Sequence, residues 1–357
     1  MTKPLPVGAT IGILGDGQLG RMLASAAAKL GFDVSIYGPH ADSPASRVCG
    51  QNVCAEYDDT ERVIAWAKTC DAVTYEFENV PVSTAHALID SDVIIRPGAK
   101  PLEVAQDRVV EKTFLRDCEI QTAEFAPIQE AGDIDEPLKA FGGQAILKTR
   151  RDGYDGKGQV RLVDGDDLIA AHKALQSVPC ILEALVPFEC EISILIARDP
   201  NGRTAIWDCP RNSHVNGILR RSVVPADIDQ RAFESAQKAA LRLVTALDYV
   251  GVLALEFFVL SDASVVANEF APRVHNSGHW TPEACLTGQF EQHIRAVAGW
   301  PLGPVERFHD VEMENLLGEE ALDVRPYLDA GHSVVLYGKR EIKPGRKMGH
   351  IVKRMRS

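Results

Sequence analysis

The stretch IGILGDGQLGRML, residues 11–23, decides how the chain begins to fold. Its apolar first half is typical of a buried strand, and Gly15, Gly17 and Gly20 lead from it into an alanine-rich helix, which is the G-x-G-x-x-G pattern. Strand-like and helix-like runs then alternate as far as residue 101, with a last strand expected at residues 93–98, and a single helix is expected at about residues 103–116. Such alternation predicts a Rossmann-like α/β domain, in which a parallel sheet carries helices on both faces.

The glycine turn is the usual signature of a dinucleotide site, so the residues around it decide whether NAD or FAD would fit. In such sites the helix N-terminus binds the pyrophosphate, and an acid at the end of the second strand binds the ribose hydroxyls. Here the second strand ends at Gly38 and His40, whereas Asp33 lies at its opposite end. The missing acid disfavours a dinucleotide. Helix packing alone would account for Gly20 but not for the polar Gln18, which we expect to contact a different ligand.

A second glycine-rich loop lies between two apolar strands at residues 146–163, ILKTRRDGYDGKGQVRLV. The glycines are not followed by Gly-Lys-Ser/Thr, which excludes a P-loop. Lys148 ends the first strand, and Arg150, Arg151 and Lys157 flank the glycines of an otherwise acidic chain. The pattern predicts a flap whose backbone amides fold over phosphates. An ordinary hairpin is the alternative.

Two carboxylates are expected to face each other in the hairpin 251–272, GVLALEFFVLSDASVVANEFAP. If residues 261–264 form a four-residue turn, Glu256 pairs with Glu269 among apolar neighbours, and strict alternation places Asn268 on the other face. Like charges so placed repel by up to about 1 kcal/mol, unless divalent cations bridge them. Hard carboxylate oxygens that leave coordination positions open for phosphate are typical of Mg²⁺ sites. A solvated charged face is the alternative, and a slipped turn would change the register.

The composition limits the classes of function that fit the chain. Its 357 residues should hold two or three domains. The net charge of -12 argues against a nucleic-acid partner, although residues 339–357 carry eight basic residues and one Glu, a local charge of +7. The eight cysteines lack C-x-x-C spacing, so we expect buried, reduced thiols in a cytoplasmic protein. The sequence shows neither a signal-peptide core nor an apolar run of about 18 residues, so no membrane association is expected.

Four motifs taken together resemble the ATP-grasp carboxylate-amine ligases of purine synthesis. They are GDGQLGRM (15–22), KTRRDGYDGKGQ (148–159), EALVPFECEIS (183–193) and NEFAPRVHNSGHWT (268–281). The resemblance extends from Gly12 to Ile351, and GYDGKGQ and NSGHWT are its most specific parts. It implies ATP- and bicarbonate-dependent carboxylation of the amine of 5-aminoimidazole ribonucleotide through carboxyphosphate.

The resemblance also implies the domain organisation and the partners. The fold class would be α/β and α+β, an ATP-grasp fold that begins with a Rossmann-like domain (1–105). A small subdomain with the flap (106–187), a large subdomain with the Mg-ATP site (188–300) and a β-rich extension (301–357) would follow. The expected ligands are ATP, two Mg²⁺ ions, bicarbonate and the ribonucleotide, and the expected assembly is a homodimer.

The residue roles that the resemblance implies fall into four sets. ATP would be bound by Arg108, Lys148, Gly153, Tyr154, Asp155, Gly156, Lys157, Gly158, Gln159, Glu183, Ala184, Leu185, Val186, Glu191, His214, Asn268 and Glu269. The ribonucleotide would be bound by Gln18, Leu19, Glu76, Tyr154, Asp155, Arg273, His275, Asn276, Lys339, Arg346 and Lys347. The metal would be bound by Glu256 and Glu269. The catalytic residues would be Lys148, Asp155 and Arg273.

Several of these residues have ordinary alternatives. Glu76 could simply end a strand, His275 could be a loop histidine, and residues 339–357 could be a solvated end of the chain. Two positions depart from the family pattern, because Asp152 stands where glycine is usual and Asp16 where glycine or asparagine is frequent. The identity of the general base stays open. Another ATP-grasp ligase, acting on formate or on a different glycinamide-type substrate, would keep the same nucleotide site, and only a panel of substrates would separate the two.

Overall fold

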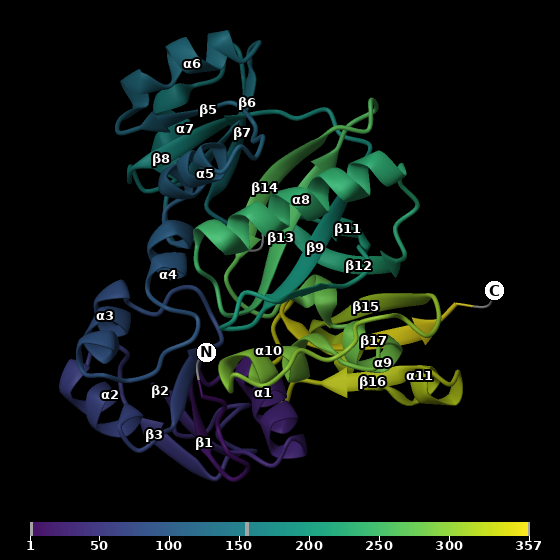
Figure 1. Ribbon diagram of the computed structural model, residues 1–357. Helices are drawn as coiled ribbons and strands as arrows, with labels where there is room; N and C mark the ends of the chain where they lie inside the picture. Colours follow the sequence, from purple (N-terminus) through teal and green to yellow (C-terminus); the bar gives the residue numbers. More distant parts are fainter. Residues whose placement is uncertain (1–2, 154–156, 356–357) are drawn as a thin grey trace.

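The computed structural model describes residues 3–153 and 157–355 of the chain. Figure 1 shows an amino-terminal sheet at the bottom (purple and blue), a small sheet at the top (teal) and a large sheet between them (green to yellow). The first sheet is parallel and the other two are antiparallel. This arrangement confirms the expected combination of α/β and α+β architecture.

The amino-terminal sheet has the strand order β3-β2-β1-β4. Its elements are β1 (Thr10–Leu14), α1 (Gln18–Lys29), β2 (Asp33–Gly38), β3 (Gln51–Cys54), α2 (Thr60–Ala67), β4 (Ala72–Tyr75) and α3 (Val82–Asp90). All its strand pairs are parallel, as the alternating pattern predicts. The strand expected at residues 93–98 is wrong, because this run forms only one bridge, between Val73 and Ile95. Pro97 lacks the N–H that a longer ladder would need.

Two helices stand where the sequence pattern predicts a single one over residues 103–116. They are α4 (Lys100–Ala105) and α5 (Arg108–Asp117). Between them Asp107 is extended, and its carboxylate accepts hydrogen bonds from the backbone N–H groups of Val109 (3.0 Å) and Val110 (3.4 Å). Asp107 therefore caps α5 and makes Arg108 its first residue.

The small sheet has the strand order β5-β8-β6-β7. Its elements are β5 (Phe125–Ile128), the short turn η1 (Ala131–Asp133), α6 (Asp135–Ala140), β6 (Gln144–Thr149), β7 (Gln159–Val163), α7 (Leu168–Ala174) and β8 (Cys180–Ala184). Leu138 of α6 packs with Leu147 and Leu182 of the sheet in one buried cluster. This core holds the strands between which the flap lies.

The large sheet runs without interruption into the carboxyl-terminal strands. Its main order is β14-β13-β9-β11-β12-β15-β17-β16, and β10 pairs with β9. The strands are β9 (Cys190–Arg198), β10 (Thr204–Ile206), β11 (Arg211–Val215), β12 (Ile218–Val224), β13 (Gly251–Val259), β14 (Val265–Ala271), β15 (Val311–Leu317), β16 (Ser333–Leu336) and β17 (Lys347–Arg354). The helices are α8 (Gln230–Ala246), α9 (Thr281–Ala284), α10 (Gln289–Val297) and α11 (Arg325–Asp329), with short turns η2 (Asn276–Gly278) and η3 (Gly318–Ala321).

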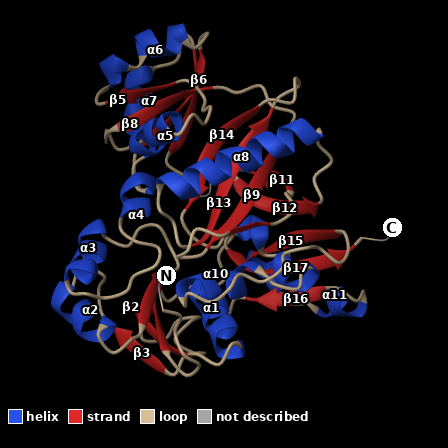
Figure 2. Cartoon of the chain, viewed as in Figure 1, coloured by secondary structure: helices blue, strands red, loops and turns tan. Residues whose placement is uncertain are grey.

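Helix α8 illustrates how the sequence builds this region. Asp229 accepts a hydrogen bond from the N–H of Arg231 and caps the helix. The buried face carries Ala232, Ala236 and Leu243 at helical spacing, and these small residues allow close approach to the sheet. Figure 2 shows α8 lying across strands β13 and β9, with which it is in contact.

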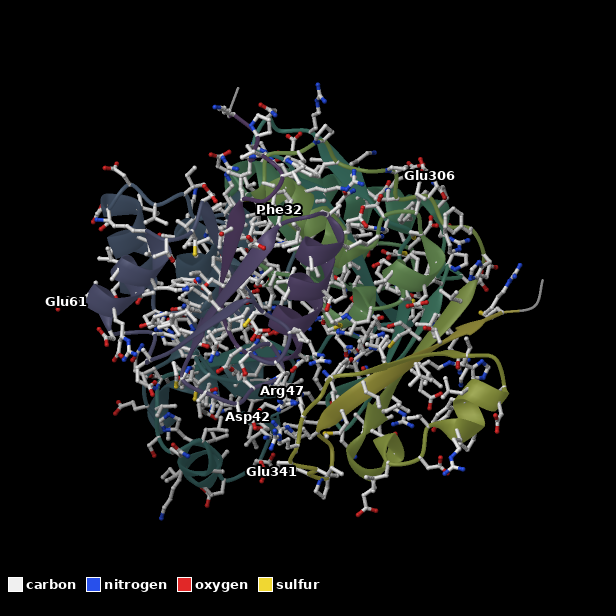
Figure 3. All side chains as sticks on the ribbon, turned by 90° about the horizontal axis from the view of Figure 1, so that it is seen from below. Phe32, Asp42, Arg47, Glu61, Glu306 and Glu341 are labelled. Atoms are coloured by element: carbon white, nitrogen blue, oxygen red, sulfur yellow. The ribbon has the colours of Figure 1, made fainter. Side chains whose placement is uncertain are left out.

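The amino-terminal sheet is fixed against the rest of the chain by buried contacts. One apolar cluster contains Ile11 of β1 together with Ile294 of α10. The Thr74 hydroxyl lies 2.8 Å from Nε2 of the buried His293, which joins β4 to α10. At the surface, Asp42 contacts Arg340 (2.9 Å), and Figure 3 shows Asp42 near the carboxyl-terminal segment. These contacts fix the amino-terminal sheet against α10 and the carboxyl-terminal segment.

Two sequence expectations concern the environment of the chain. In the described residues no helix is both long enough and apolar enough to cross a membrane. All eight cysteines are free, but only Cys180, Cys190, Cys209 and Cys285 are buried. Cys54 is exposed, so the expectation that all the thiols are buried is wrong.

Candidate active site

A cleft of about 760 Å³ lies where the amino-terminal sheet, the flap, the large sheet and the carboxyl-terminal strands meet. It brings together many of the residues singled out in the sequence. Those that line it are Gln18, Leu19, Glu76, Arg108, Gly153, Lys157, Glu256, Glu269, Arg273, His275, Asn276, Lys339, Arg346 and Lys347. Other members of the sets are not among its lining residues, namely Lys148, Gly158, Gln159, Glu183, Ala184, Leu185, Val186, Glu191, His214 and Asn268. Three further members, Tyr154, Asp155 and Gly156, lie outside the described residues.

The glycine turn holds a carboxylate that belongs to the chain itself. The backbone N–H groups of Gly17 and Gly20 donate to the two carboxylate oxygens of Glu76, which follows β4. A Cβ atom at Gly15 would lie 2.1 Å from Cγ of Glu76, so the turn needs glycine there. Glu76 is 6% exposed, and burial raises its pKa to about 7 even though the two amides favour the ionised form. The Glu76 carboxylate therefore occupies the position at the turn where an anionic ligand would otherwise bind.

Asp16 covers the end of β2, where a dinucleotide ribose would lie. Its carboxylate accepts a hydrogen bond from the N–H of His40 at 3.0 Å. A Cβ atom at Gly38 would lie 2.8 Å from Oδ2 of Asp16. Side chains of the chain thus occupy both the pyrophosphate position and the ribose position. This agrees with the argument from sequence against NAD or FAD.

The carboxylate hairpin differs in register from the expected one. Val265 pairs with Val259 rather than with Leu260, so the four-residue turn predicted at 261–264 is wrong. The cause lies in the loop, where Ala263 takes a left-handed conformation (φ 66°) and the Leu260 N–H donates to the Ser264 carbonyl at 2.9 Å. A three-residue loop that ends in such a residue is a common hairpin geometry.

A β-bulge then compensates for the slipped turn. Leu255 pairs with Phe270, so on β14 two residues, Asn268 and Glu269, stand opposite the single residue Glu256. The two carboxylates meet at this bulge rather than as a regular pair. The bulge also interrupts strict alternation, so the reason for placing Asn268 on the other face no longer holds.

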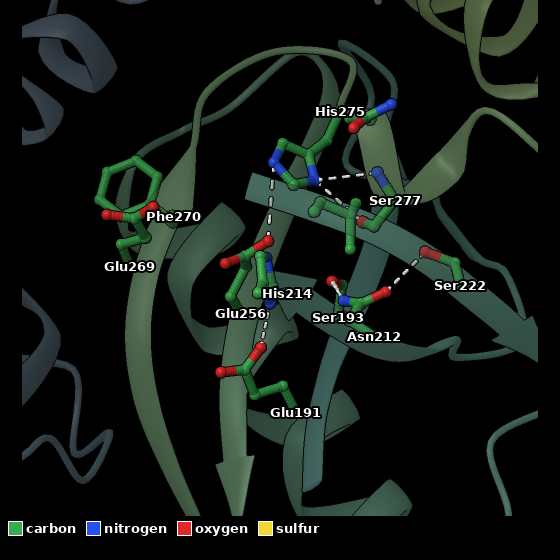
Figure 4. Close-up of polar contacts among 12 residues, drawn as sticks. Glu191, Ser193, Asn212, His214, Ser222, Glu256, Glu269, Phe270, His275 and Ser277 are labelled. Atoms are coloured by element: carbon green, nitrogen blue, oxygen red, sulfur yellow. Dashed lines mark hydrogen bonds and ion pairs between the residues drawn. The ribbon is translucent and has the colours of Figure 1, made fainter. Parts of the chain in front are cut away.

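The pKa values of the two carboxylates at the bulge shift in opposite directions. Burial raises the pKa of Glu256, and the charge of Glu269 raises it further. Burial acts in the same direction on Glu269, but Arg108, whose Nη1 lies 2.8 Å from Oε2, outweighs it and lowers the pKa. In Figure 4, Glu256 lies between His275, whose Nε2 is 3.6 Å from Oε1, and His214.

The donor set at the bulge fits a divalent cation of the Mg²⁺ type. In the parts of the chain that the structure describes, no group of three or more His, Cys, Asp or Glu residues is placed to hold a metal. Mg²⁺ in nucleotide sites uses one or two carboxylates and completes its coordination with phosphate and water. Glu256 and Glu269 supply two such carboxylates. The charge of Glu269 adds to burial in raising the pKa of Glu256, a repulsion that a bound cation would offset.

Two lysines, one on α5 and one on β6, share one buried carboxylate on β8. Nζ of Lys148 and Nζ of Lys112 each lie 3.2 Å from Oε2 of Glu183. These two cations hold the pKa of Glu183 at about 2 against the effect of burial, and burial lowers the pKa of Lys148. Oε1 of Glu183 is buried without a hydrogen-bond partner. Lys112 was missed in the sequence, although it lies one helical turn after Arg108.

The hinge from β8 to β9 leads to a second charged pair. Oε2 of Glu191 contacts Nδ1 of His214, and Figure 4 shows the two side chains on neighbouring strands below Glu256. Burial lowers the pKa of His214, but the hydrogen bond and charge of Glu191 outweigh it and raise the pKa overall. The structure therefore brings together the two residues to which the resemblance gives the ribose and nucleotide contacts.

The base of the flap is tied to the start of α5. Nη2 of Arg150 lies 2.8 Å from Oδ2 of Asp107, and Nη2 of Arg108 donates to the Gly153 carbonyl at 3.1 Å. Asp152 has a positive φ of 61°, the conformation that favours glycine.

Arg273 and the carboxyl-terminal cations line the other side of the cleft. Nη2 of Arg273 lies 2.7 Å from Oε1 of Glu78, and its Nε contacts the second oxygen of the same carboxylate. Glu78 was missed in the sequence, although it lies two residues after Glu76. Nζ of Lys339 donates to the Lys347 carbonyl at 2.8 Å, and both residues line the cleft.

Three family models match successive parts of the chain. They are the Ribonucleotide synthetase preATP-grasp domain (residues 8–106), the ATP-grasp domain (113–290) and the Phosphoribosylaminoimidazole carboxylase C-terminal domain (312–355). The N5-carboxyaminoimidazole ribonucleotide synthase of Brucella melitensis is 50% identical over 352 residues, which cover 98% of this chain and 97% of the relative. The similarity to this relative therefore extends over nearly the full length of both chains.

Solved structures agree with the sequence relatives. An ADP complex of an N5-carboxyaminoimidazole ribonucleotide synthetase matches with a TM-score of 0.95 at 39% identity, covering 99% of this chain and 94% of that one. An N5-carboxyaminoimidazole synthase from Aspergillus clavatus, in complex with ADP and 5-aminoimidazole ribonucleotide, matches with a TM-score of 0.91 at 29% identity, covering 98% and 94%. The chain therefore belongs to the N5-carboxyaminoimidazole ribonucleotide synthase family, the ATP-grasp ligases of purine biosynthesis.

Proposed function

We propose that the cleft carboxylates the 5-amino group of 5-aminoimidazole ribonucleotide with bicarbonate and ATP, giving 5-carboxyaminoimidazole ribonucleotide, ADP and phosphate. One observation carries this assignment. Arg108, which suits a nucleotide phosphate, and Glu269, which suits a metal bound to such a phosphate, line the same cleft as the cations Lys339, Arg346 and Lys347. A shared cleft lets an unstable intermediate made from ATP reach the amine without crossing bulk water.

On the nucleotide side, Arg108, Lys148 and the flap (153–159) would bind the phosphates of ATP. The hinge 183–186 would hold adenine, and Glu191 and His214 would contact the ribose and the nucleotide. The ammonium pair around Glu183 supports the phosphate role, because two lysines share a single carboxylate. Glu256 and Glu269, with Asn268 beside them, would hold Mg²⁺, which would offset the negative charge of the phosphates.

The ribonucleotide would lie on the opposite side of the cleft. Its phosphate would meet Lys339, Arg346 and Lys347, where a cationic surface is favourable for an anion. The remaining contacts would come from Gln18, Leu19, Glu76, Tyr154, Asp155, Arg273, His275 and Asn276. The bidentate contact between Arg273 and Glu78 supports this placement, because it holds the guanidinium in one orientation at the cleft wall.

The chemistry needs two transfers in one enclosed space. A bicarbonate oxygen attacks the γ-phosphorus of ATP, the bond to ADP breaks, and carboxyphosphate forms. Carboxyphosphate then breaks down to CO₂ and phosphate, and the 5-amino nitrogen attacks the CO₂ carbon while its proton passes to the released phosphate or to Asp155. Lys148 and Arg273 would stabilise the negative charge that develops on oxygen. The closed flap would exclude water.

Partners and location are further parts of the proposal. We infer a homodimer from the family resemblance, which sedimentation velocity would test. The eight free cysteines support a reducing compartment such as the cytoplasm. The net charge of -12 disfavours a nucleic-acid partner.

Release of ADP tests the proposal directly. We expect ADP formation to require both bicarbonate and 5-aminoimidazole ribonucleotide, and Glu269→Ala to abolish it. ADP formation that another amine or carboxylate supports equally well would refute the substrate assignment. Brisk turnover by Glu269→Ala with Mg²⁺ would refute the metal assignment instead.

A further inference from the structure

The bulge that presents Glu269 lies on β14, the last strand of the large sheet. A bulge disrupts the hydrogen-bond ladder, and an edge strand has backbone groups that no neighbouring strand can pair. The backbone on either side of Glu269 therefore needs partners from outside the sheet. This requirement is strict, because the Glu269 carboxylate must keep a defined position relative to Glu256.

Two adjacent side chains of α5 supply these partners. Oε1 of Glu111 accepts a hydrogen bond from the Phe270 N–H at 2.7 Å, and Nζ of Lys112 donates to the Asn268 carbonyl. The two bonds hold the two peptide units that flank Glu269, one on each side of its Cα atom. Glu111 is 2% exposed and Lys112 is 1% exposed, so water has little access to either contact.

Each side chain complements its backbone partner, because Glu111 offers an acceptor to a backbone donor and Lys112 offers a donor to a backbone acceptor. A carboxyl oxygen of Glu111 accepts from the N–H, and the ammonium of Lys112 donates to the carbonyl. Lys112 also contacts Glu183, so it joins the bulge to the hinge strand β8 as well. Arg108, one turn earlier on α5, contacts the carboxylate of Glu269 itself. The first turns of α5 thus hold both the backbone and the side chain of Glu269.

We propose that Glu111 and Lys112 are positioning residues that clamp the backbone of Glu269 and so set the geometry of its carboxylate for the nucleotide-bound metal. This inference rests on the proposed metal role of Glu269. Neither residue touches the reacting atoms. Their contribution is to restrict the φ and ψ angles of Glu269 from both sides.

Matched variants at Glu111 test the clamp. Glu111→Leu removes the acceptor and puts an apolar side chain in its place, whereas Glu111→Gln keeps an acceptor oxygen. Two readouts apply: the amide hydrogen-exchange rate of Phe270 in the metal-free protein, and the Mg²⁺ concentration that gives half-maximal ADP formation. For Glu111→Leu we expect at least tenfold faster exchange and at least a tenfold higher Mg²⁺ requirement. Both values should stay within about twofold of wild type for Glu111→Gln and for the control Thr113→Ala, whose hydroxyl bonds only within α5.

The outcomes separate the clamp from the metal assignment. A folded Glu111→Leu protein with the wild-type exchange rate at Phe270 and the wild-type Mg²⁺ requirement would overturn the clamp. A tenfold increase in either value for Glu111→Gln would overturn it as well. If Glu111→Leu does not fold, Lys112→Met decides the question, because it removes the other bond and should raise the Mg²⁺ requirement at least tenfold; an unchanged requirement overturns the clamp. Glu269→Gln tests the proposed function separately. If that variant keeps the wild-type Mg²⁺ requirement, the metal assignment fails, while the exchange rate of Phe270 still decides the clamp.

Discussion

The carboxyl group of Glu76 should make the stability of the chain depend on pH. It is buried at the glycine turn, where the N–H groups of Gly17 and Gly20 donate to it. The change to make is Glu76→Gln, because glutamine keeps the shape of the side chain but does not titrate. Comparison of the two proteins over a range of pH then isolates the titration of this one group.

The expected size follows from the pKa of Glu76. The pKa rises from an ordinary value of 4.5 to about 7 in the folded chain, mainly because of burial. One pKa unit corresponds to about 1.4 kcal/mol, so ionisation of Glu76 should destabilise the folded state by about 3 kcal/mol relative to the unfolded state. The folded state binds the proton more tightly. The stabilisation is therefore complete below the unfolded pKa of 4.5 and is lost as the pH rises through about 7.

Urea unfolding measured between about pH 4.5 and about pH 8 tests this expectation. The free energy of unfolding of wild type minus that of Glu76→Gln should fall by about 3 kcal/mol across this range. Glu61→Gln is the control, because Glu61 lies at the start of α2 and is exposed (Figure 3). A difference that stays constant within about 0.5 kcal/mol, or that increases with pH, would refute the buried-carboxyl account.

Three further substitutions test single features of the turn and the flap. Asp152→Gly should leave stability unchanged or raise it by up to about 1 kcal/mol in urea unfolding, because glycine adopts the positive φ freely; a loss of more than about 1 kcal/mol would contradict this. Asp107→Ala should lower stability by about 1–2 kcal/mol in the same assay, because it removes the cap of α5 and the partner of Arg150; an unchanged unfolding midpoint would refute that role. Gly15→Ala should lower the thermal midpoint by several degrees, because the added Cβ overlaps Glu76; a midpoint equal to that of wild type would show that the turn adapts.

The parts of the fold that follow local periodicity could be predicted from the sequence. Alternation of strands and helices gives the parallel sheet, because burial repeats at regular spacing within each element. The register of the carboxylate hairpin could not be predicted in this way. It depends on Ala263, which adopts a left-handed conformation normally taken by glycine or asparagine. The strand expected at 93–98 failed for a similar local reason, since Pro97 cannot continue a ladder.

The candidate site was predictable where a motif carries it and was missed where a distant contact does. Glu76, Glu256 and Glu269 stand in recognisable patterns. Glu78 is recognised as part of the site only by its contact with Arg273, which lies 195 residues away in the sequence. Lys112 is defined by a carbonyl 156 residues away. Pairings of this kind depend on how the domains pack together, and no local pattern encodes them.

The glycine turn shows how one backbone geometry can serve ligands of opposite character. In a dinucleotide site the free amides of the turn attract a phosphate. Here the Glu76 carboxylate satisfies the amides of Gly17 and Gly20, so the turn offers the cleft a carboxylate. Each carboxylate oxygen can accept more than one hydrogen bond, so Glu76 could still accept from a ligand hydroxyl or amine. The sugar or base of a ribonucleotide has such donors and its phosphate has none, which agrees with placing the phosphate away from this turn, beside Lys339.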